Sequence, residues 1–487
     1  MPQKAIKAFL WDYIGLFLRN GGSFIIGVFL ARLLSPRDYG IVSLMGFFIG
    51  ISEVIMTMGF SSALIVKKDV EEIHYSTVFW LNLALGCSLY ILFFVLSPVF
   101  ARFYDEPILE NVIKITCIAF IFNSMNLVQT VKLTKKINFK SQTKAQIIAL
   151  IVSGASAILM AVNGFGLWSL VYYSLLSSFI YTCSLYFFEQ WLPKLIFSWN
   201  AVRELWKYAS NMFASGMLHQ VFGKLDVLFI GKFLPVAILG NYNRAVSFNT
   251  LINRFTSESI GKVSFPYLIT KNNNAEIISL NSKILGIISM AIFGVTGLIY
   301  LNADFIIITL FSAKWMASIP ILKIIILSAF SNPVNVQILS VIKAKGKSDI
   351  FLKLEIFRKI IYVITFLIGF WIGTNSGIEF GGLYGIMYGI LTFSILSTIL
   401  SIYYAGKVLE QKSWYQFKII IKYALLAFIP SIFIIFLFNN LPEQGLLLSF
   451  LIKTIFFSLL YLAGLLFFKT QAITDLKIIV YQFRNRK

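Results

Sequence analysis

Two stretches of the sequence decide the fold, because each joins two long apolar segments in the same way. The first is ARLLSPRDYG, Ala31–Gly40, and the second is IGKFLPVAILG, Ile230–Gly240. In both, a proline stands in the turn before the next apolar segment, where the first amides of a helix lack partners and proline costs little. Placing each residue on the one 200 positions later superimposes Gly40 on Gly240. One turn used twice predicts an internal duplication.

Two further pairs of segments match in the same order. FYDEPILENVIK, residues 103–114, resembles FSAKWMASIPILK, residues 311–323, since both contain an aromatic residue, a short turn, Pro-Ile-Leu and a lysine. VKLTKKINFKSQTK, residues 131–144, and IKAKGKSDIFLK, residues 342–353, both form a basic turn after the next apolar segment. Three matches in one order, at offsets of 200 to 211 residues, strengthen the prediction of a duplication.

The composition predicts an all-α polytopic membrane protein. Of 487 residues, 58% are hydrophobic and 13% are charged, with a mean hydropathy of +0.82, whereas soluble domains carry about 25% charged residues. Apolar runs of about 20 residues recur, and a helix of that length crosses a hydrocarbon layer of about 30 Å. The fourteen predicted spans are residues 9–34, 40–66, 76–101, 108–131, 145–162, 165–188, 209–233, 236–261, 284–301, 318–342, 354–374, 378–406, 419–439 and 445–468.

Two boundaries need separate interpretation. The first span, residues 9–34, is longer than the apolar region of a signal peptide and has no small-residue cleavage site, so we expect it to stay as the first membrane helix. Residues 303–311 are predicted to continue the ninth span.

The distribution of basic residues predicts the orientation. The formal net charge is +21, and 28 Lys and Arg residues lie in or at the edges of the termini and even-numbered connections, against 5 in or at the edges of the odd-numbered ones. The positive-inside rule therefore places both termini in the cytoplasm, and it identifies anionic membrane lipids, rather than nucleic acid, as the partner of this charge. Three cysteines and two scattered histidines indicate no disulfide framework, metal site or cofactor.

The duplication predicts two lobes of six helices. Residues 1–190 form the N-lobe, residues 191–208 a cytoplasmic linker, residues 209–406 the C-lobe, and residues 407–487 two further helices with a basic tail. Because six is an even number, the lobes enter the membrane from the same side, as parallel repeats related by an axis along the membrane normal. Transporters built from such repeats bind their substrate at the repeat interface.

The turn segments also resemble those of a known family. ARLLSPRDYGIVSL, MGFSSALIVKKD and KLDVLFIGKFLPVAILGNYNRA, which begin at residues 31, 58 and 224, are similar to segments of the Wzx-like O-antigen and capsule flippases of the multidrug/oligosaccharidyl-lipid/polysaccharide (MOP) exporter superfamily. The resemblance implies a V-shaped protein that flips an undecaprenyl-diphosphate-linked oligosaccharide across the bacterial cytoplasmic membrane by alternating access. It further implies the polysaccharide polymerase machinery as a partner.

Charged residues in the predicted spans mark candidate site residues, since each costs about 2.5–3.5 kcal/mol at a helix centre. On the first, second, seventh and eighth spans, polar residues three and four apart share one face. The cations there are predicted to bind the diphosphate, because a guanidinium fork suits phosphate oxygens: they are Arg19, Arg244, Arg254 and, more weakly, Lys224. The acids are predicted to pair with these cations or, less favoured, to carry a coupling proton or sodium ion: they are Glu53, Asp226 and Glu258.

Three other functions remain as alternatives. A multidrug exporter of the same superfamily, moving cationic drugs, would be expected to have an acidic cavity, whereas cations here at least equal anions. A polymerase or ligase would need catalytic groups in a sizeable outer loop, and the predicted outer loops are short and lack a nucleophile–base or paired-carboxylate site. The protein is therefore predicted not to be an enzyme. A scaffold would leave the charges within the membrane unexplained.

Overall fold

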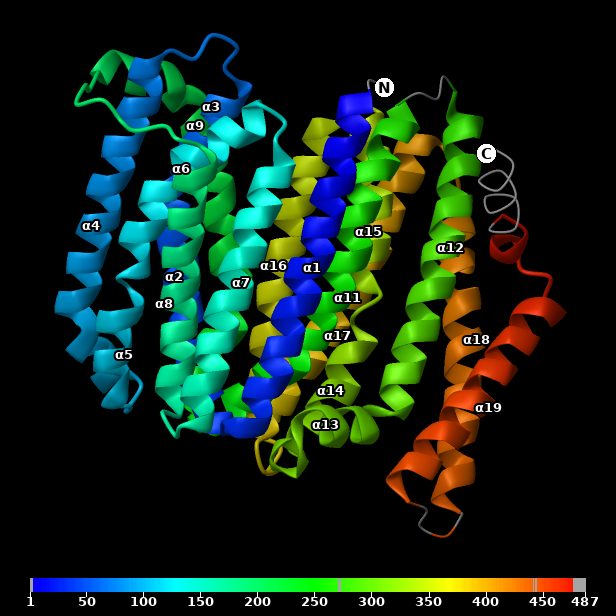
Figure 1. Ribbon diagram of the computed structural model, residues 1–487. Helices are drawn as coiled ribbons and strands as arrows, with labels where there is room; N and C mark the ends of the chain where they lie inside the picture. Colours follow the sequence, from blue (N-terminus) through cyan, green and yellow to red (C-terminus); the bar gives the residue numbers. More distant parts are fainter. Residues whose placement is uncertain (1–2, 270–272, 441, 443–444, 476–487) are drawn as a thin grey trace. The chain divides into compact units, whose positions relative to one another are not determined.

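The chain is helical throughout the part that the structure describes. The computed structural model describes residues 3–269, 273–440, 442 and 445–475, and over these ranges it contains helices and no strand (Figure 1). Packing divides the chain into two compact units, Met1–Asn243 and Arg244–Lys487. The boundary between these units lies inside a helix, and the lobes and linker deduced from the repeat remain a prediction.

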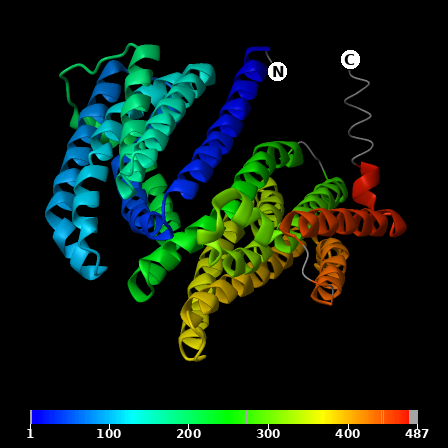
Figure 2. The same cartoon turned by 60° about the horizontal axis from the view of Figure 1, so that its bottom comes forward.

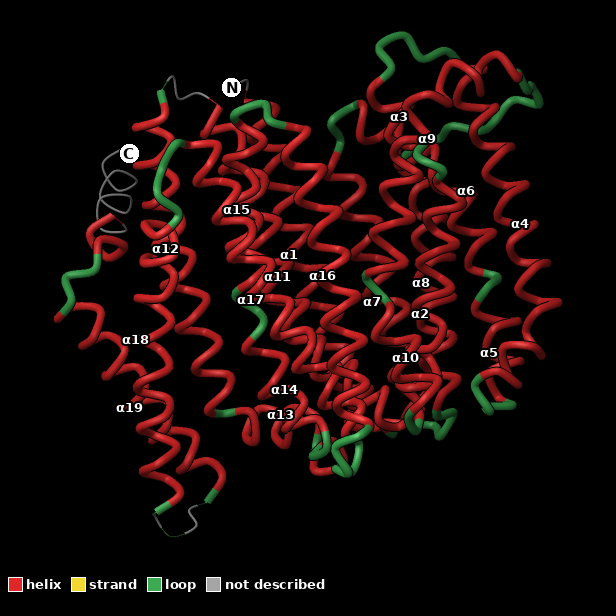
Figure 3. Tube along the Cα trace, turned by 180° about the vertical axis from the view of Figure 1, so that it is seen from behind, coloured by secondary structure: helices red, strands yellow, loops and turns green. Residues whose placement is uncertain are grey.

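The first unit contains ten helices within its described residues and the beginning of an eleventh. They are α1 (Gln3–Leu33), α2 (Pro36–Thr57), α3 (Phe60–Val66), α4 (Glu72–Phe103), α5 (Ile108–Thr116), α6 (Ala119–Lys135), α7 (Phe139–Val162), α8 (Leu167–Phe188), α9 (Trp199–Phe222), α10 (Leu225–Phe233) and the start of α11 (Val236–Ile269). Figure 3 shows that the connections between them are short, except the one from α8 to α9.

The second unit begins within α11 and continues to the C-terminal helices. Its further elements are α12 (Asn274–Leu301), α13 (Ala303–Phe311), the 3₁₀ turn η1 (Ala313–Trp315), α14 (Ser318–Leu327), α15 (Ser331–Ala344), α16 (Ser348–Thr374), α17 (Gly381–Leu409), α18 (Trp414–Asn439) and α19 (Leu446–Phe467). The yellow pair α16 and α17 runs side by side (Figure 2). Glycines permit this approach, since a Cβ at Gly385 would lie 2.0 Å from the Gly369 carbonyl oxygen.

Twelve helical segments of the described residues are long and apolar enough to cross a membrane. They coincide with twelve of the fourteen predicted spans, and the all-α polytopic class is confirmed. The exceptions are the predicted spans 209–233 and 236–261. The first is interrupted at Gly223 and Lys224, and the second carries Arg244 and Arg254, so polar residues lower the apolar character of both segments.

The duplication is visible in matching helix ends. Ile137 follows α6 with φ 55° and Gly346 follows α15 with φ 69°. In the first repeat the Asn138 N–H donates to the Leu133 carbonyl at 2.9 Å, and 209 positions later the Lys347 N–H donates to the Ile342 carbonyl at 3.3 Å. A left-handed residue followed by a hydrogen bond back across the last turn is a common way to end a helix. The two basic turns thus share one backbone conformation.

The two turns that decide the fold pack directly on each other inside the first unit. A Cβ at Gly40 would lie 1.9 Å from the Val236 carbonyl oxygen, and a Cβ at Gly240 would lie 1.8 Å from the Pro36 carbonyl oxygen. The contacts are reciprocal, because Val236 and Gly240 stand 200 positions after Pro36 and Gly40. Glycine is used twice here because two helix backbones cross at a distance that leaves no room for a side chain.

One expected helix continuation is wrong. Residues 303–311 do not extend the ninth span, because α12 ends at Leu301 and α13 begins as a separate helix that turns away from its axis (Figure 1). The Asn302 amide nitrogen donates to the Leu298 carbonyl at 2.9 Å and to the Thr454 hydroxyl at 3.2 Å. Asn302 therefore provides a hydrogen bond to a carbonyl in the last turn of α12 and links this helix to α19.

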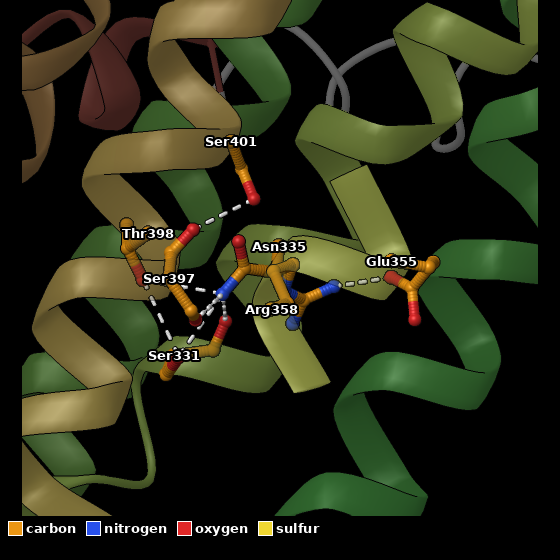
Figure 4. A network of polar contacts seen from close by, with 7 residues as sticks. All are labelled: Ser331, Asn335, Glu355, Arg358, Ser397, Thr398 and Ser401. Atoms are coloured by element: carbon orange, nitrogen blue, oxygen red, sulfur yellow. Dashed lines mark hydrogen bonds and ion pairs between the residues drawn. The ribbon is translucent and has the colours of Figure 1, made fainter. Parts of the chain in front are cut away.

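A buried polar seam joins α15 to α17 (Figure 4). The Asn335 amide nitrogen lies 2.8 Å from the Ser331 carbonyl oxygen and 3.2 Å from the Thr398 hydroxyl. The Ser331 hydroxyl also donates to the Ser394 carbonyl of α17 at 3.1 Å. Polar side chains between membrane helices stabilise their association by such bonds.

Candidate functional site

A cleft lined by polar and apolar side chains lies within the first unit. Two cavities of about 430 Å³ and 450 Å³ adjoin one another, because Asn123 and Tyr181 line both. Glu53 lines the first cavity and Arg19 lines the second. The structure thus brings two of the sequence-predicted site residues, one of each charge, into one cleft.

Close packing of α1 on α7 positions Arg19. A Cβ at Gly15 would lie 2.5 Å from the Thr143 hydroxyl oxygen, and one at Gly22 would lie 2.5 Å from the Leu150 side chain. The Thr143 hydroxyl donates to the Trp11 carbonyl at 3.1 Å. Small residues therefore hold α1 against α7. The exposed Arg19 side chain forms no ion pair with any other described side chain, so its five N–H donors are available.

Glu53 of α2 shares its cavity with amides and hydroxyls. No described side chain forms an ion pair or hydrogen bond with its carboxylate. Asn82 of α4 lines the same cavity, is fully buried, and has no described partner for either its amide nitrogen or its amide oxygen. Leaving a buried amide without a partner costs about 1–3 kcal/mol. This end of the cleft is therefore suited to a ligand that brings its own donors and acceptors.

Asp226 has structural partners. Its carboxylate accepts a hydrogen bond from the Tyr242 hydroxyl and another, at 2.9 Å, from the Val227 N–H in the first turn of α10. Lys224 immediately precedes this helix. The carboxylate therefore caps α10 and ties it to the start of α11.

The remaining predicted residues lie in the second unit. Arg244 is only 7% exposed, and its guanidinium carbon lies 4.7 Å from the centre of the Phe311 ring and 5.2 Å from that of the Trp315 ring. Both distances are within the range of a cation–π interaction. Arg254 is exposed on α11, and the side chain of Glu258 lies outside the described part of the structure. Diphosphate binding by Arg244, Arg254 or Lys224 stays a prediction.

Sequence reasoning missed the uncharged lining of the cleft and one charged pair. Asn82, Asn123 and Tyr181 lie on α4, α6 and α8, and these three side chains gave no signal because they carry no charge. On α16, the Arg358 guanidinium donates to the Glu355 carboxylate at 2.6 Å (Figure 4). A search for charges in every predicted span would have found this pair.

Apolar helices, an internal repeat and a cleft within a helical bundle define a polytopic helical membrane protein. The chain belongs to the polysaccharide biosynthesis protein family, which it matches over residues 29–320, more than half its length. This match confirms the resemblance to a family of polysaccharide biosynthesis. The protein is thus a multi-pass membrane protein of a bacterial family.

Individual relatives agree with this assignment. The teichuronic acid biosynthesis protein TuaB of Bacillus subtilis is 27% identical over 311 residues, which cover 61% of this chain and 62% of TuaB. The chain therefore spans less than two thirds of the length of that relative. Among solved structures, the lipid II flippase MurJ in an inward closed conformation superimposes with a TM-score of 0.72 at 16% identity, over 96% of this chain and 99% of MurJ. An inward-facing multidrug resistance MATE family transporter gives a TM-score of 0.59 at 15% identity, over 83% of this chain and 99% of the transporter. Both structures share the fold.

Proposed function

We propose that the protein flips a polyprenyl-diphosphate-linked oligosaccharide, a repeat unit of an O-antigen, capsule or exopolysaccharide, across the bacterial cytoplasmic membrane. Both termini lie in the cytoplasm, and the protein acts by alternating access without making or breaking covalent bonds in its substrate. The observation that carries the proposal is the cleft of the first unit, in which Arg19 and Glu53 face a lining of amides and hydroxyls. Membership of the polysaccharide biosynthesis family supports the same substrate class.

The lining of the cleft suits the two parts of such a substrate. The Arg19 guanidinium can donate two parallel hydrogen bonds to phosphate oxygens and keeps its charge in a low dielectric. The amides of Asn82 and Asn123 and the hydroxyl of Tyr181 can exchange hydrogen bonds with sugar hydroxyls. Charge-assisted contacts would hold the diphosphate, and neutral polar contacts would select the sugar.

Reconstituted protein tests this function. Proteoliposomes would contain polyprenyl-diphosphate oligosaccharide labelled in one leaflet, and its accessibility to a membrane-impermeant glycosidase would be followed with and without the protein. We expect the protein to move the lipid to the other leaflet. Absence of this movement together with efflux of a cationic dye from the same vesicles would assign the protein to drug export instead, and the shared fold alone does not separate these two functions.

Glu53 is proposed to couple transport to an ion gradient, because its carboxylate has no ion pair with any described side chain. Glu53→Gln removes the charge and the exchangeable proton while keeping the size of the side chain. We expect this variant to bind substrate but to lose the dependence of transport on a proton or sodium gradient, measured in the same vesicles. Transport that still responds to the gradient as in the wild type would exclude Glu53 as the coupling group.

A further inference from the structure

The connection from α8 to α9 exposes large apolar side chains. Leu192 is 71% exposed, Leu195 is 88% exposed, and Trp199, at the start of α9, is 65% exposed. Trp206 on the next turns of α9 is also exposed. A soluble surface rarely presents so much contiguous apolar area without a partner. We call residues 191–207 the linker patch.

The connection is held in place by its backbone. The Lys194 N–H donates to the Ser76 hydroxyl at 3.1 Å, and the Lys194 carbonyl accepts from the Trp80 indole at 2.8 Å. The Ser198 N–H donates to the Thr77 hydroxyl at 3.1 Å. The polar backbone is thus satisfied toward α4, while the side chains of Leu192 and Leu195 stay exposed.

These bonds place the linker patch beside the first turns of α4. With 32 residues, α4 is about 48 Å long and extends beyond a hydrocarbon layer of about 30 Å by about 9 Å, or six residues, at each end. Ser76, Thr77 and Trp80 lie four to eight positions after Glu72, the first residue of α4. For a helix centred in the hydrocarbon layer, this places the segment bonded to them where the hydrocarbon meets the lipid headgroups.

The charge of the linker patch is positive. Lys194, Arg203 and Lys207 are exposed, and none forms an ion pair with a described side chain. Three nearby acids are already paired: Glu189 with Lys136 at 2.6 Å, Glu72 with Lys132 at 3.9 Å, and Glu204 with Lys67 and His74. Hydrogen bonds from Lys67 and His74 hold the pKa of Glu204 below its usual range, so this carboxylate stays charged and occupied at neutral pH.

We propose that the linker patch binds anionic phospholipid of the inner leaflet, with Lys194, Arg203 and Lys207 on the headgroup phosphates and Leu192, Leu195, Trp199 and Trp206 among the upper acyl chains. Tryptophan and leucine beside basic residues, at the depth of the headgroups, are the composition of segments that lie in the membrane interface. Juxtamembrane basic residues are attracted to anionic lipid. The connection between the two repeats is thereby fixed to the membrane surface.

A spin label at position 195 tests this proposal. Leu195→Cys would be labelled in full-length protein that carries Cys87→Ser and Cys183→Ser, leaving only the buried Cys117. Accessibility to oxygen, which partitions into lipid, would be compared with accessibility to a water-soluble nickel complex. In vesicles containing phosphatidylglycerol we expect a lipid-immersed label. In pure phosphatidylcholine we expect a larger water-exposed population.

Charge neutralisation supplies the decisive comparison. A triple variant that carries Lys194→Gln, Arg203→Gln and Lys207→Gln should lower the ratio of immersed to water-exposed label in phosphatidylglycerol vesicles by about fivefold for each charge removed. The control variant carries Lys345→Gln, Lys347→Gln and Lys353→Gln in a different basic turn, removes the same charge, and should leave the ratio unchanged. A label exposed to water in both lipids, or equal effects of the two triple variants, would overturn the proposal. Protection that appears only when a membrane-protein extract is added would assign the surface to a protein partner instead.

Discussion

Gly40→Ala and Gly240→Ala are each expected to destabilise the protein by about 3 kcal/mol, at the upper end of ordinary overpacking. Each added methyl group would lie less than 2 Å from a carbonyl oxygen of the opposing helix, at 1.9 Å for Gly40 and 1.8 Å for Gly240. Backbone atoms cannot rotate aside as a flexible side chain can, so α2 and α11 must separate. We expect a lower melting temperature in detergent and a reduced yield of folded protein.

The same crossing predicts the behaviour of the double variant. Once one methyl group has forced the two helices apart, the second has more room. The double variant should therefore lose less stability than the sum of the losses in the two single variants. Gly46→Ala is the matched control, because Gly46 lies on α2 as well and a Cβ there would meet no atom within 4 Å. Alanine in a helix interior is favoured over glycine by about 0.5–1 kcal/mol. Equal stability of Gly40→Ala and Gly46→Ala would contradict the crossing.

Arg19→Ala is expected to lower the rate of lipid flipping about tenfold to hundredfold. A hydrogen bond to a charged group contributes about 1.5–3 kcal/mol, and about 1.4 kcal/mol corresponds to a factor of ten. Arg19 lies in the cleft without an ion pair to any described side chain, so its loss removes substrate contacts and no described internal bond. The glycosidase-accessibility assay measures the effect directly.

Two further variants separate charge from geometry at this position. Arg19→Lys keeps the positive charge and loses the planar fork, so we expect a rate between those of the wild type and Arg19→Ala. Arg102→Ala removes an exposed arginine at the end of α4, outside the lining of the cleft, and should flip lipid normally. Full transport by Arg19→Ala at normal expression would remove Arg19 from the site.

Much of the fold could be predicted because it depends on signals local in the sequence. Apolar length defines twelve of the membrane-spanning segments, and matched turns reveal the duplication. The helix breaks after Thr116, the end of α5, and after Leu327, the end of α14, were not predicted, although Pro333 lies in the first turn of the helix that follows the second break. The breaks fall 211 positions apart, so the repeat extends to the helix breaks.

The candidate site could be predicted only in part, since it depends on contacts between distant segments. Arg19 and Glu53 stand out as charges in apolar helices, and both line the cleft. The same reasoning selected Arg244, but rings of α13 and η1, more than sixty residues further along the chain, enclose its guanidinium. The helical periodicity around Arg244 does not predict its contact with those rings. Asn82 was missed because an uncharged amide gives no signal in the sequence. Only the structure shows that it is buried without a partner.

The reciprocal contact of Gly40 and Gly240 has a consequence for the ancestry of the chain. In a homodimer with twofold symmetry, each interface residue of one subunit meets the same partner that its copy meets in the other. In a dimer of a half-length chain, the glycine of each subunit would lie against the corresponding carbonyl of the other subunit. Gly40 against Val236 and Gly240 against Pro36 show this pattern within one chain. In such a dimer a single substitution of that glycine would change the interface twice. Fusion of two copies into one chain would make the two positions separately heritable, so each half could diverge while the crossing itself stayed under constraint.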